Sequence, residues 1–456
     1  MYDILIKRGK YPDFEAGTFI EGNVAIIGDK IVAIGDVEGD AKRVIDATGR
    51  VVSPGFIDIH MHEEQFLEDG EKYIISELML LMGVTTALGG NCGVNRQDVK
   101  VFREVIERLG GAPINYMVLA GYNSERVKMG VGRHEPATDE QIEALTEKLR
   151  SEVEDGAYGI SFGVEYDPGM PYEEVMKVLK GMPQEDLFVS MHYRDDSTGA
   201  IDSINEMISF AKESGKRFQI SHLSSCSCMG QMEEAMPLIN KAIAENPRLD
   251  YDTYPYNAFS TEIGTAVFED GCFEQWGKGP EDLFMTSGKY KNQFCTMETF
   301  KEIRRDDPHV RLVAFVMNEH EIAEAIANPS CGMIGSDGGV NRNAGHPRTS
   351  GTFPRVLGKY VREDKVISLI DALRKMTWAP AKRLDLTQKG RIAVGCDADI
   401  TIFDPETIKD GSTFENIFIK PVGIDAVIVN GQLAVDHNEI VNARAGEFMP
   451  GPCTKK

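Results

Sequence analysis

The pattern of apolar and polar positions divides the chain into two strand-rich ends and a middle of alternating strands and helices. Each end carries short Val/Ile runs broken by turn residues, as in "GNVAIIGDKIVAIGD" near the amino terminus and "GIDAVIVNGQLAVDHNEI" near the carboxyl terminus. Because the two ends share this pattern, we expect residues 1–54 and 385–456 to pair as one small β-sandwich.

The middle segment, residues 55–384, alternates short buried-strand patterns with longer amphipathic helical patterns. This alternation implies parallel pairing, and eight units predict an α/β fold, a closed (β/α)8 TIM-like barrel. The segment exceeds the ~250 residues typical of such barrels. The widest gap separates strands seven and eight and predicts a lid or insertion within about 262–330. The predicted strands are 55–61, 84–90, 114–121, 157–163, 186–193, 217–224, 249–255 and 332–338.

Composition and charge narrow the class of protein. The 456 residues are 42% apolar and 27% charged, which is typical of globular chains, and the net charge is −23. An acidic chain is a poor partner for nucleic acid or for an anionic membrane. No apolar run approaches the ~18 residues that span a bilayer, and the first residues resemble no signal peptide. Eight cysteines without a C-x-x-C pair favour a reduced, cytoplasmic protein over a disulfide scaffold.

A polar row interrupts the first predicted strand, "GFIDIHM". Side chains alternate across a strand, so Asp58, His60 and His62 should share one face. Neutral imidazole is a common metal ligand. For an isolated His-x-His, however, a hydrogen-bonded pair of histidines without a metal is the favoured interpretation, because this spacing is common, so other residues must decide.

Further candidate ligands follow other predicted strands. Cys92 follows the second strand, His192 ends the fifth, His222 ends the sixth and Asp337 ends the eighth. In an eight-stranded barrel these strand ends surround one pocket at the carboxyl-terminal mouth. The convergence predicts a metal centre there.

Zinc is the predicted metal, because a thiolate favours a borderline-soft ion. Six donors exceed the needs of one tetrahedral ion and predict two adjacent sites. Zinc lowers the pKa of bound water to about 7 and polarises a carbonyl. Asp337 could take a proton from that water and pass it to a leaving nitrogen, which predicts hydrolysis of an amide or related bond. We expect Cys92, His192 and His222 at a tight site, and His60, His62 and Asp337 at a weaker one.

The ordered motifs resemble the amidohydrolase superfamily, and more narrowly the N-acyl-D-amino-acid deacylase (D-aminoacylase) family. They include "SPGFIDIHMH", "GVTTALGGNCG", "QISHL", "GSDGG" and "HPRTSGTFPRVLGKYVRE". The resemblance implies the barrel, the flanking sandwich, zinc at the tight site, acid–base work by Asp337, and cleavage of the acyl amide bond of N-acyl-D-amino acids. "GISFG" has no lysine, so the carbamylated lysine of dihydroorotases and hydantoinases is missing and Cys92 takes its place.

Substrate contacts are also implied by the resemblance. Tyr166 and Arg348 match family positions that hold the substrate carboxylate, and a guanidinium can grip a carboxylate bidentately. The alternatives are packing for Tyr166 and a surface salt bridge for Arg348. Ser260 is a further polar candidate. Arg194, on the face of His192, is expected to orient either a ligand or the carboxylate.

Two departures from the family pattern bear on the substrate. The family's lysine two residues past His222 is here Ser224, which should share that histidine's face and reach the pocket. The third strand ends in "LAGYNSER", so Tyr122 and Asn123 should line a different wall. These changes leave a cyclic-amide hydrolase, of hydantoin, lactam or dihydropyrimidine type, as an alternative. A metal-free assembly barrel would lack ligands, and none is missing here.

The expected partner is a small amide substrate bearing a carboxylate. The sequence predicts neither a nucleic acid nor a membrane as partner. It leaves the number of subunits open, a homo-oligomer included.

Overall fold

The central strands of the protein pair in a cyclic order. In the computed structural model, which describes residues 1–455, one parallel sheet has the order β6-β7-β8 and another the order β9-β10-β11-β12-β13-β17. β9 follows β8 after one residue, and a parallel bridge from Met61 to Gly338 brings the end of β17 beside the end of β6. The strands are β6 (Phe56–Asp58), β7 (Val84–Gly89), β8 (Asn115–Val118), β9 (Ala120–Gly121), β10 (Gly159–Gly163), β11 (Phe188–His192), β12 (Arg217–Ile220), β13 (Leu249–Thr253) and β17 (Met333–Ile334).

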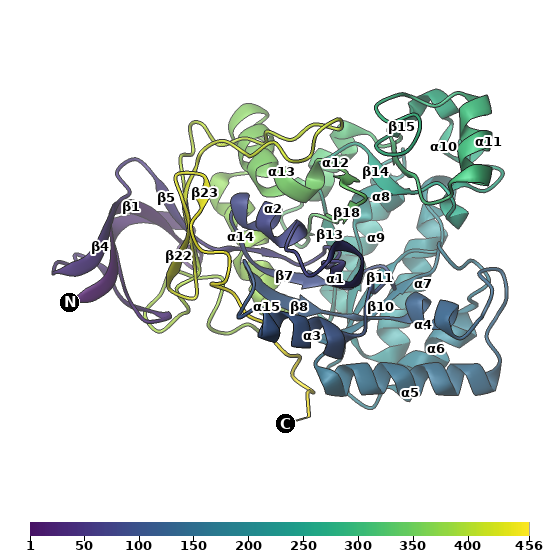
Figure 1. Cartoon of the computed structure of the whole chain (residues 1–456), viewed down its shortest axis with the longest axis horizontal. Helices are drawn as coiled ribbons and strands as arrows, with labels where there is room; N and C mark the ends of the chain where they lie inside the picture. Colours follow the sequence, from purple (N-terminus) through teal and green to yellow (C-terminus); the bar gives the residue numbers. More distant parts are fainter. Residues whose placement is uncertain (456) are drawn as a thin grey trace.

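Helices cover the outside of these strands (Figure 1). Strands such as β10 and β11 are buried along their whole length, because one face meets the interior and the other meets the helices. α5 begins with a capping box in which Thr138 and Gln141 each accept a backbone N–H. The covering helices include α2 (Ile75–Leu81), α3 (Val99–Arg108), α5 (Asp139–Asp155), α6 (Tyr172–Gly181), α7 (Ala200–Ser214), α9 (Met232–Glu245), α12 (Glu319–Ala327) and α14 (Leu369–Met376).

Strands from both ends of the chain form one nine-stranded sheet at the opposite end of the molecule from α11 (Met297–Asp306), as Figure 1 shows. β20 pairs antiparallel with β5, which makes strands from the two ends of the chain neighbours in this sheet. Buried Ile and Val side chains such as Ile6, Val24 and Ile428 pack into a separate cluster on this sheet. Its strands are β1 (Tyr2–Asp13), β2 (Thr18–Ile27), β3 (Lys30–Gly35), β4 (Ala41–Asp46), β5 (Val51–Pro54), β20 (Ile400–Phe403), β21 (Ile424–Val429), β22 (Gln432–Asp436) and β23 (Glu439–Ile440).

The last residues of the chain leave this sheet and run along the central strands and helices. The carbonyl of Gly446 accepts a hydrogen bond from the Ala112 N–H at 2.8 Å, and Gly451 donates to the carbonyl of Gly156 at 3.0 Å. The tail therefore packs on the middle segment, whereas the sequence pattern placed it with the terminal strands.

An insertion separates β13 from β17, where the sequence leaves its widest gap. It has its own antiparallel sheet, in the order β14-β16-β15, made by β14 (Phe259–Glu262), β16 (Arg311–Ala314) and β15 (Leu283–Met285). Together with α10 (Cys272–Trp276) and α11 (Met297–Asp306), this sheet stands apart from the nine-stranded sheet (Figure 1). The indole N–H of Trp276 reaches both carboxylate oxygens of Asp196 at 3.0 Å, which ties the insertion to the central part.

Among the helices of residues 1–455, none is both long enough and apolar enough to cross a bilayer.

Candidate metal centre

Three side chains from the ends of different strands meet at one point. The sulfur of Cys92 lies 3.4 Å from Nε2 of His222, and Nδ1 of His192 lies 3.0 Å from the same nitrogen. The three donor atoms all lie within 4.8 Å of one another. The geometry therefore brings together the group expected at the tight site, within reach of a common ion.

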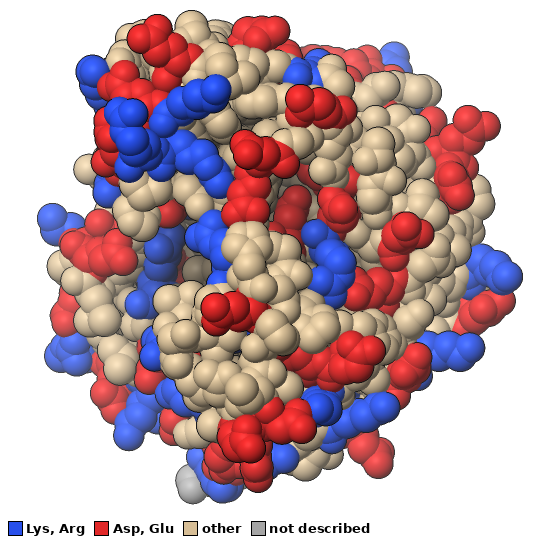
Figure 2. Space-filling model, turned by 90° about the vertical axis from the view of Figure 1, so that its right-hand side faces the viewer, with Lys and Arg blue, Asp and Glu red and all other residues tan. Residues whose placement is uncertain are grey.

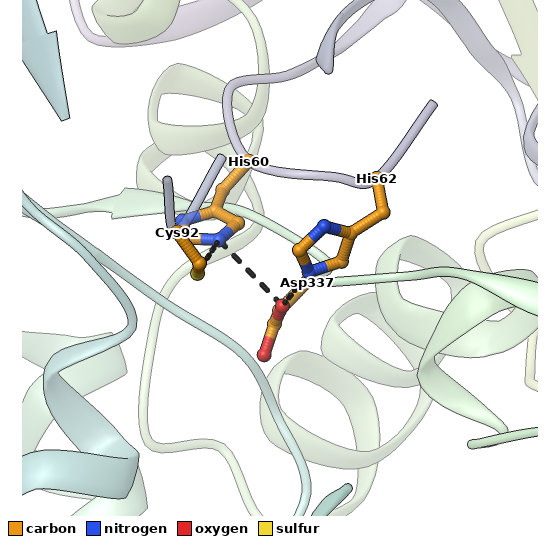
Figure 3. A group of neighbouring side chains, drawn as sticks. All are labelled: His60, His62, Cys92 and Asp337. Carbon is orange, nitrogen blue, oxygen red and sulfur yellow. Dashed lines mark hydrogen bonds and ion pairs between the residues drawn. The ribbon is translucent and has the colours of Figure 1, made fainter. Parts of the chain in front are cut away.

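Figure 3 shows a second group of donors, which shares Cys92 with the first. Nε2 of His60 is 3.5 Å from the Cys92 sulfur and 3.6 Å from Oδ1 of Asp337. That same Oδ1 lies 3.1 Å from Nε2 of His62. Cys92 belongs to both groups, whereas the sequence pattern predicted it at the tight site alone. Its sulfur is thus placed to bridge two adjacent positions.

Three of these donors sit on unusual backbone. Cys92, His222 and Asp337 have φ values of 56°, 31° and 50°, in the left-handed region that residues other than glycine seldom adopt. Each stands where the chain has just left a central strand. Such backbone costs on the order of 1–3 kcal/mol per residue and tends to occur at functional sites.

Each histidine that contacts Cys92 has a partner on its other ring nitrogen. Metal-binding histidines typically have such partners, which fix the ring orientation and the tautomer. None of these three partners was predicted from the sequence. Two of them are carboxylates that stand in strand-end motifs, Asp252 in "LDYDTYP" and Glu165 in "GVEYDPG", and this was the signal available. The pairs are His60 Nδ1 with Asp252 Oδ1 at 3.0 Å, His192 Nε2 with Glu165 Oε2 at 2.6 Å, and His222 Nδ1 with Ser225 Oγ at 2.8 Å.

The electrostatics of the site favour ionised donors. Burial raises the pKa of the Cys92 thiol, but its interactions with the surrounding histidines, His60 and His222 first among them, outweigh burial and hold the pKa well below its usual value. Burial likewise raises the pKa of Asp337, but the Arg348 guanidinium, together with the neighbouring histidines, more than reverses the effect and holds the pKa well below its usual value. A buried thiolate, a carboxylate and imidazoles in one place are a donor set suited to a divalent cation such as zinc.

A cavity of about 440 Å³ opens beside the centre, a volume that suits a small-molecule ligand. Its inner end is lined by His62, Cys92 and Asp337. Ser260 and neighbouring residues of β14 line another wall, so the insertion helps to form the cavity. A second, much smaller cavity of about 20 Å³ adjoins His192 and His222.

Two of the predicted substrate-contacting residues lie at the cavity wall. Tyr166 lines both cavities, and its ring centroid is 4.6 Å from that of His192. Ser260 also lines both cavities, and its buried hydroxyl has no hydrogen-bond partner among residues 1–455. Both side chains are therefore placed to contact a ligand beside the metal centre.

Arg348 lies behind the centre and does not line the cavity. Its Nη2 is 2.8 Å from Oδ2 of Asp337, and its Nε donates to the Asp337 carbonyl at 2.7 Å. The side chain is only 3% exposed and stacks over Tyr254. The alternative prediction of a surface salt bridge is therefore wrong, because the ion pair that Arg348 forms is buried. The charge of Arg348 stabilises the Asp337 carboxylate.

Ser224 does not face the centre as the strand pattern suggested. β12 ends at Ile220, and the positive φ of His222 turns the chain into α8 (Leu223–Ser227). The alternation that would have brought Ser224 to the face of His222 stops there. Ser225 bonds to the imidazole in its place, while the Ser224 hydroxyl is buried without a partner among residues 1–455.

Tyr122 and Arg194 have structural contacts instead of a place at the cavity wall. The Tyr122 hydroxyl, at the start of α4 (Tyr122–Lys128), donates to Glu174 at 2.9 Å. Arg194 donates hydrogen bonds to the Glu206 carboxylate from Nε at 2.9 Å and from Nη2 at 2.7 Å. Of the pair expected from "LAGYNSER", only Asn123 lines the cavity.

Glu63 fixes the loop that carries Cys92. The carboxylate is 2% exposed and accepts hydrogen bonds from the backbone N–H groups of Gly90 at 3.0 Å and Arg96 at 2.7 Å. These two positions bracket Cys92. Glu63 therefore holds the cysteine in place from outside the donor set.

Comparison with known proteins identifies the family. The model of the Amidohydrolase family matches residues 43–142 and 298–435, slightly more than half of the chain. The chain belongs to the amidohydrolase family. It is thus a hydrolase that acts on amide C–N bonds.

Within the amidohydrolase family, the chain is similar along nearly its whole length to deacylases. It is 28% identical to a D-aminoacylase of Alcaligenes xylosoxydans xylosoxydans, over 98% of this chain and 97% of that protein. It is 30% identical to an N-acyl-D-glutamate deacylase of the same organism, over 94% and 93%. The crystal structure of an N-acyl-D-glutamate deacylase from Bordetella bronchiseptica, complexed with zinc and a phosphonate inhibitor, aligns with a TM-score of 0.88 at 25% identity, covering 98% of this chain and 99% of that one.

Proposed function

We propose that this amidohydrolase is a zinc-dependent deacylase that cleaves the acyl amide bond of an N-acyl-D-amino acid or a closely related amide. The observation that carries the proposal is the Cys92 sulfur, which lies between two groups of donors at the inner end of a cavity. The deacylase relatives support the choice of substrate class.

Two metal positions are part of the proposal. Cys92, His192 and His222 would hold one zinc ion tightly. The other donor group in Figure 3, His60, His62 and Asp337 around the shared Cys92, would hold a second ion more weakly. When bound, zinc would supply an acidified water molecule and a Lewis acid for the scissile carbonyl.

The protein's own groups then have distinct tasks. Asp337, ionised because Arg348 holds its pKa low, would accept a proton from the attacking water through its carboxylate and pass it to the leaving nitrogen. Tyr166 and Ser260 would contact the substrate from the cavity wall. The insertion would exclude water by closing that wall.

The proposal includes a division of the chain into domains. We assign residues 55–384 to a (β/α)8 catalytic barrel, with a lid within about 262–330, and the strands of residues 1–54 and 385–456 to a β-sandwich. The cyclic strand order and the shared nine-stranded sheet support this division. Assembly into a homo-oligomer stays a prediction.

A substrate screen on zinc-replete enzyme tests the function. We expect hydrolysis of N-acetyl-D-amino acids and little or none of the N-acetyl-L-amino acids, hydantoin or dihydrouracil. Cleavage of the cyclic amides alone would overturn the deacylase and favour the cyclic-amide alternative.

The metal assignment has its own test. The variant Cys92→Ala should lose the tightly bound zinc and nearly all activity, measured by elemental analysis and turnover. Cys228→Ala is the matched control, because this buried thiol lies in neither donor group. Full zinc retention in Cys92→Ala would refute the proposed site.

A further inference from the structure

Two arginines at the cavity wall have no acidic partner. Arg96, in the loop after Cys92, and Arg311, at the start of β16, both line the cavity of about 440 Å³. Neither side chain forms an ion pair within residues 1–455. Lys128, on the same wall, differs, because Asp98 and Glu125 lie 2.7 and 2.8 Å from its ammonium group. A third arginine of the wall, Arg133, also lacks an ion pair within residues 1–455, but it is exposed and donates to the carbonyl of Gly264 at 2.8 Å. Arg96 and Arg311 therefore place two further positive charges on the wall without an ion-pair partner.

Arg311 is tethered without being neutralised. Its Nη1 donates to the carbonyl of Ser260 at 3.3 Å, and its Nε is buried without a hydrogen-bond partner among residues 1–455. The residue opposite it in the sheet is Glu262. The two oxygens of that carboxylate are already occupied, by Asn341 at 2.9 Å and His309 at 2.9 Å.

Positive charge accumulates around Arg311. Burial lowers its pKa, Glu262 opposes that effect, and the positive charges of Arg96 and Arg348 lower the pKa further. The charge of Arg348 is balanced by Asp337 at 2.8 Å, but nothing balances the other two in the same way. Like charges in a partly buried cavity repel one another, and an anion between them relieves the repulsion.

The other side of the metal centre cannot take an anion so easily. The small cavity beside His192 and His222 measures about 20 Å³ and is lined by the acids Glu165, Asp196 and Asp337, with no lysine or arginine in its wall. A carboxylate entering there would meet like charges. The larger cavity also has three acids in its wall, but four basic side chains accompany them there. The face of the molecule that carries the insertion has a hollow with basic and acidic side chains around it (Figure 2).

We propose that Arg96 and Arg311 form a carboxylate-binding subsite, which makes the preferred substrate an acyl amide that carries a second carboxylate besides the α-carboxylate. The inference rests on the proposed deacylase function and specifies its substrate class. The second carboxylate could belong to the amino-acid side chain or to the acyl group, since both would place an anion at some distance from the scissile bond. The guanidinium groups can each donate two hydrogen bonds to it.

Paired substrates that differ only in charge test the subsite. N-acetyl-D-glutamate and N-acetyl-D-glutamine probe the side chain, and N-succinyl-D-leucine and N-succinamoyl-D-leucine probe the acyl group. In at least one pair we expect the wild-type kcat/KM to favour the acidic member by about 10-fold or more, as for a charged hydrogen bond. The variants Arg96→Gln and Arg311→Gln should each reduce this ratio toward one, through a higher KM for the acidic substrate only.

The matched control is Arg305→Gln, which removes the same charge from an exposed position on α11 where the arginine pairs with the neighbouring Asp306. This variant should keep the wild-type ratio. Equal losses for the acidic and the neutral members in Arg96→Gln and Arg311→Gln would overturn the subsite, as would a wild-type ratio near one in both pairs.

A binding measurement separates failure of the subsite from failure of the deacylase function. Titration calorimetry with glutarate and butyrate on the zinc-loaded enzyme needs no turnover. We expect glutarate to bind about 10-fold more tightly than butyrate to the wild type and no more tightly to the Arg96→Gln/Arg311→Gln double variant. If no N-acyl-D-amino acid is cleaved but glutarate binds more tightly than butyrate, the deacylase function is wrong and the subsite stands. If the wild type binds glutarate and butyrate with equal affinity, the subsite is refuted.

Discussion

Asp337 and Arg348 form a buried ion pair in which each oxygen of the carboxylate has a different neighbour. Oδ2 lies 2.8 Å from Nη2 of Arg348, while Oδ1 lies 3.1 Å from His62 and 3.6 Å from His60. The arginine therefore stabilises the charge from one side and leaves the other oxygen to the metal centre. This arrangement combines an ionised carboxylate with low exposure to water.

Replacing Arg348 should impair both folding and catalysis. Arg348→Gln leaves Asp337 buried without its counter-ion, and breaking a buried pair typically costs about 3–5 kcal/mol. We expect a fall of about 100-fold in kcat/KM together with a lower melting temperature. Arg348→Lys keeps the charge but cannot donate to both Oδ2 and the Asp337 carbonyl, so its losses should be smaller. A Gln variant with wild-type kcat/KM would contradict this role.

The sequence could predict which donors converge, because all parallel strands of a barrel end at one rim. That rule places Cys92, His192 and His222 correctly without any knowledge of the loops. It fails for Ser224, since the alternation it relies on ends where the backbone of His222 turns left-handed. The ion pair of Arg348 with Asp337 could not be predicted from the sequence either, because it depends on how α13 (Arg348–Arg355) packs behind the last strand.

The residues that contact the metal-donor side chains could not be predicted from the sequence either. Asp252 lies on a strand whose pattern shows only that it is buried, and its 3.0 Å approach to His60 Nδ1 brings together two strands that are far apart along the chain. Glu63 follows His62 in the sequence, where it could equally assist a second metal or be solvated, but it is buried under the loop of Cys92. Such contacts depend on packing between segments, for which a single sequence gives no periodic signal.

Asp337→Asn should separate metal binding from turnover. The amide keeps the shape of the side chain but cannot accept the proton of the attacking water, and general acid–base groups contribute about 10²–10⁴-fold. We expect kcat to fall by that order while zinc remains at the site of Cys92, His192 and His222. Elemental analysis and steady-state kinetics check the two parts. An unchanged kcat would remove Asp337 from the proton transfers.

Glu63→Gln should weaken zinc binding although Glu63 is not a ligand. The amide can accept one of the two backbone hydrogen bonds, and its NH2 group then faces the other N–H. Losing a charged hydrogen bond costs about 1.5–3 kcal/mol, and changes around metal ligands typically cost 10–100-fold in affinity. Competition with a chromophoric chelator measures the affinity. Glu68→Gln, an exposed neighbour on α1 (Phe66–Asp69), should bind zinc like the wild type.

Lys375 predicts a pH dependence of stability. It is 8% exposed on α14 and donates to the carbonyls of Cys331 and Gly332, just before β17. Burial lowers its pKa from 10.5 to about 8, an effect that Asp250 only partly opposes. Between those two pH values the unfolded chain holds a proton that the folded chain has released, so the free energy of unfolding rises with pH. The cost of burying the charge, up to about 3 kcal/mol, is therefore full below pH 8 and fades toward pH 10.5.

The variant Lys375→Met removes this cost at every pH and loses two hydrogen bonds at every pH. Its stability relative to the wild type should therefore fall as the pH rises from about 7 to about 9.5, by roughly 1–2 kcal/mol. Chemical denaturation at several pH values measures the difference. Lys241→Met, an exposed change on α9, should keep a constant offset from the wild type. If the offset of Lys375→Met is also constant, the buried ammonium does not titrate in this range, and its hydrogen bonds to the strand that leads to Asp337 hold it charged.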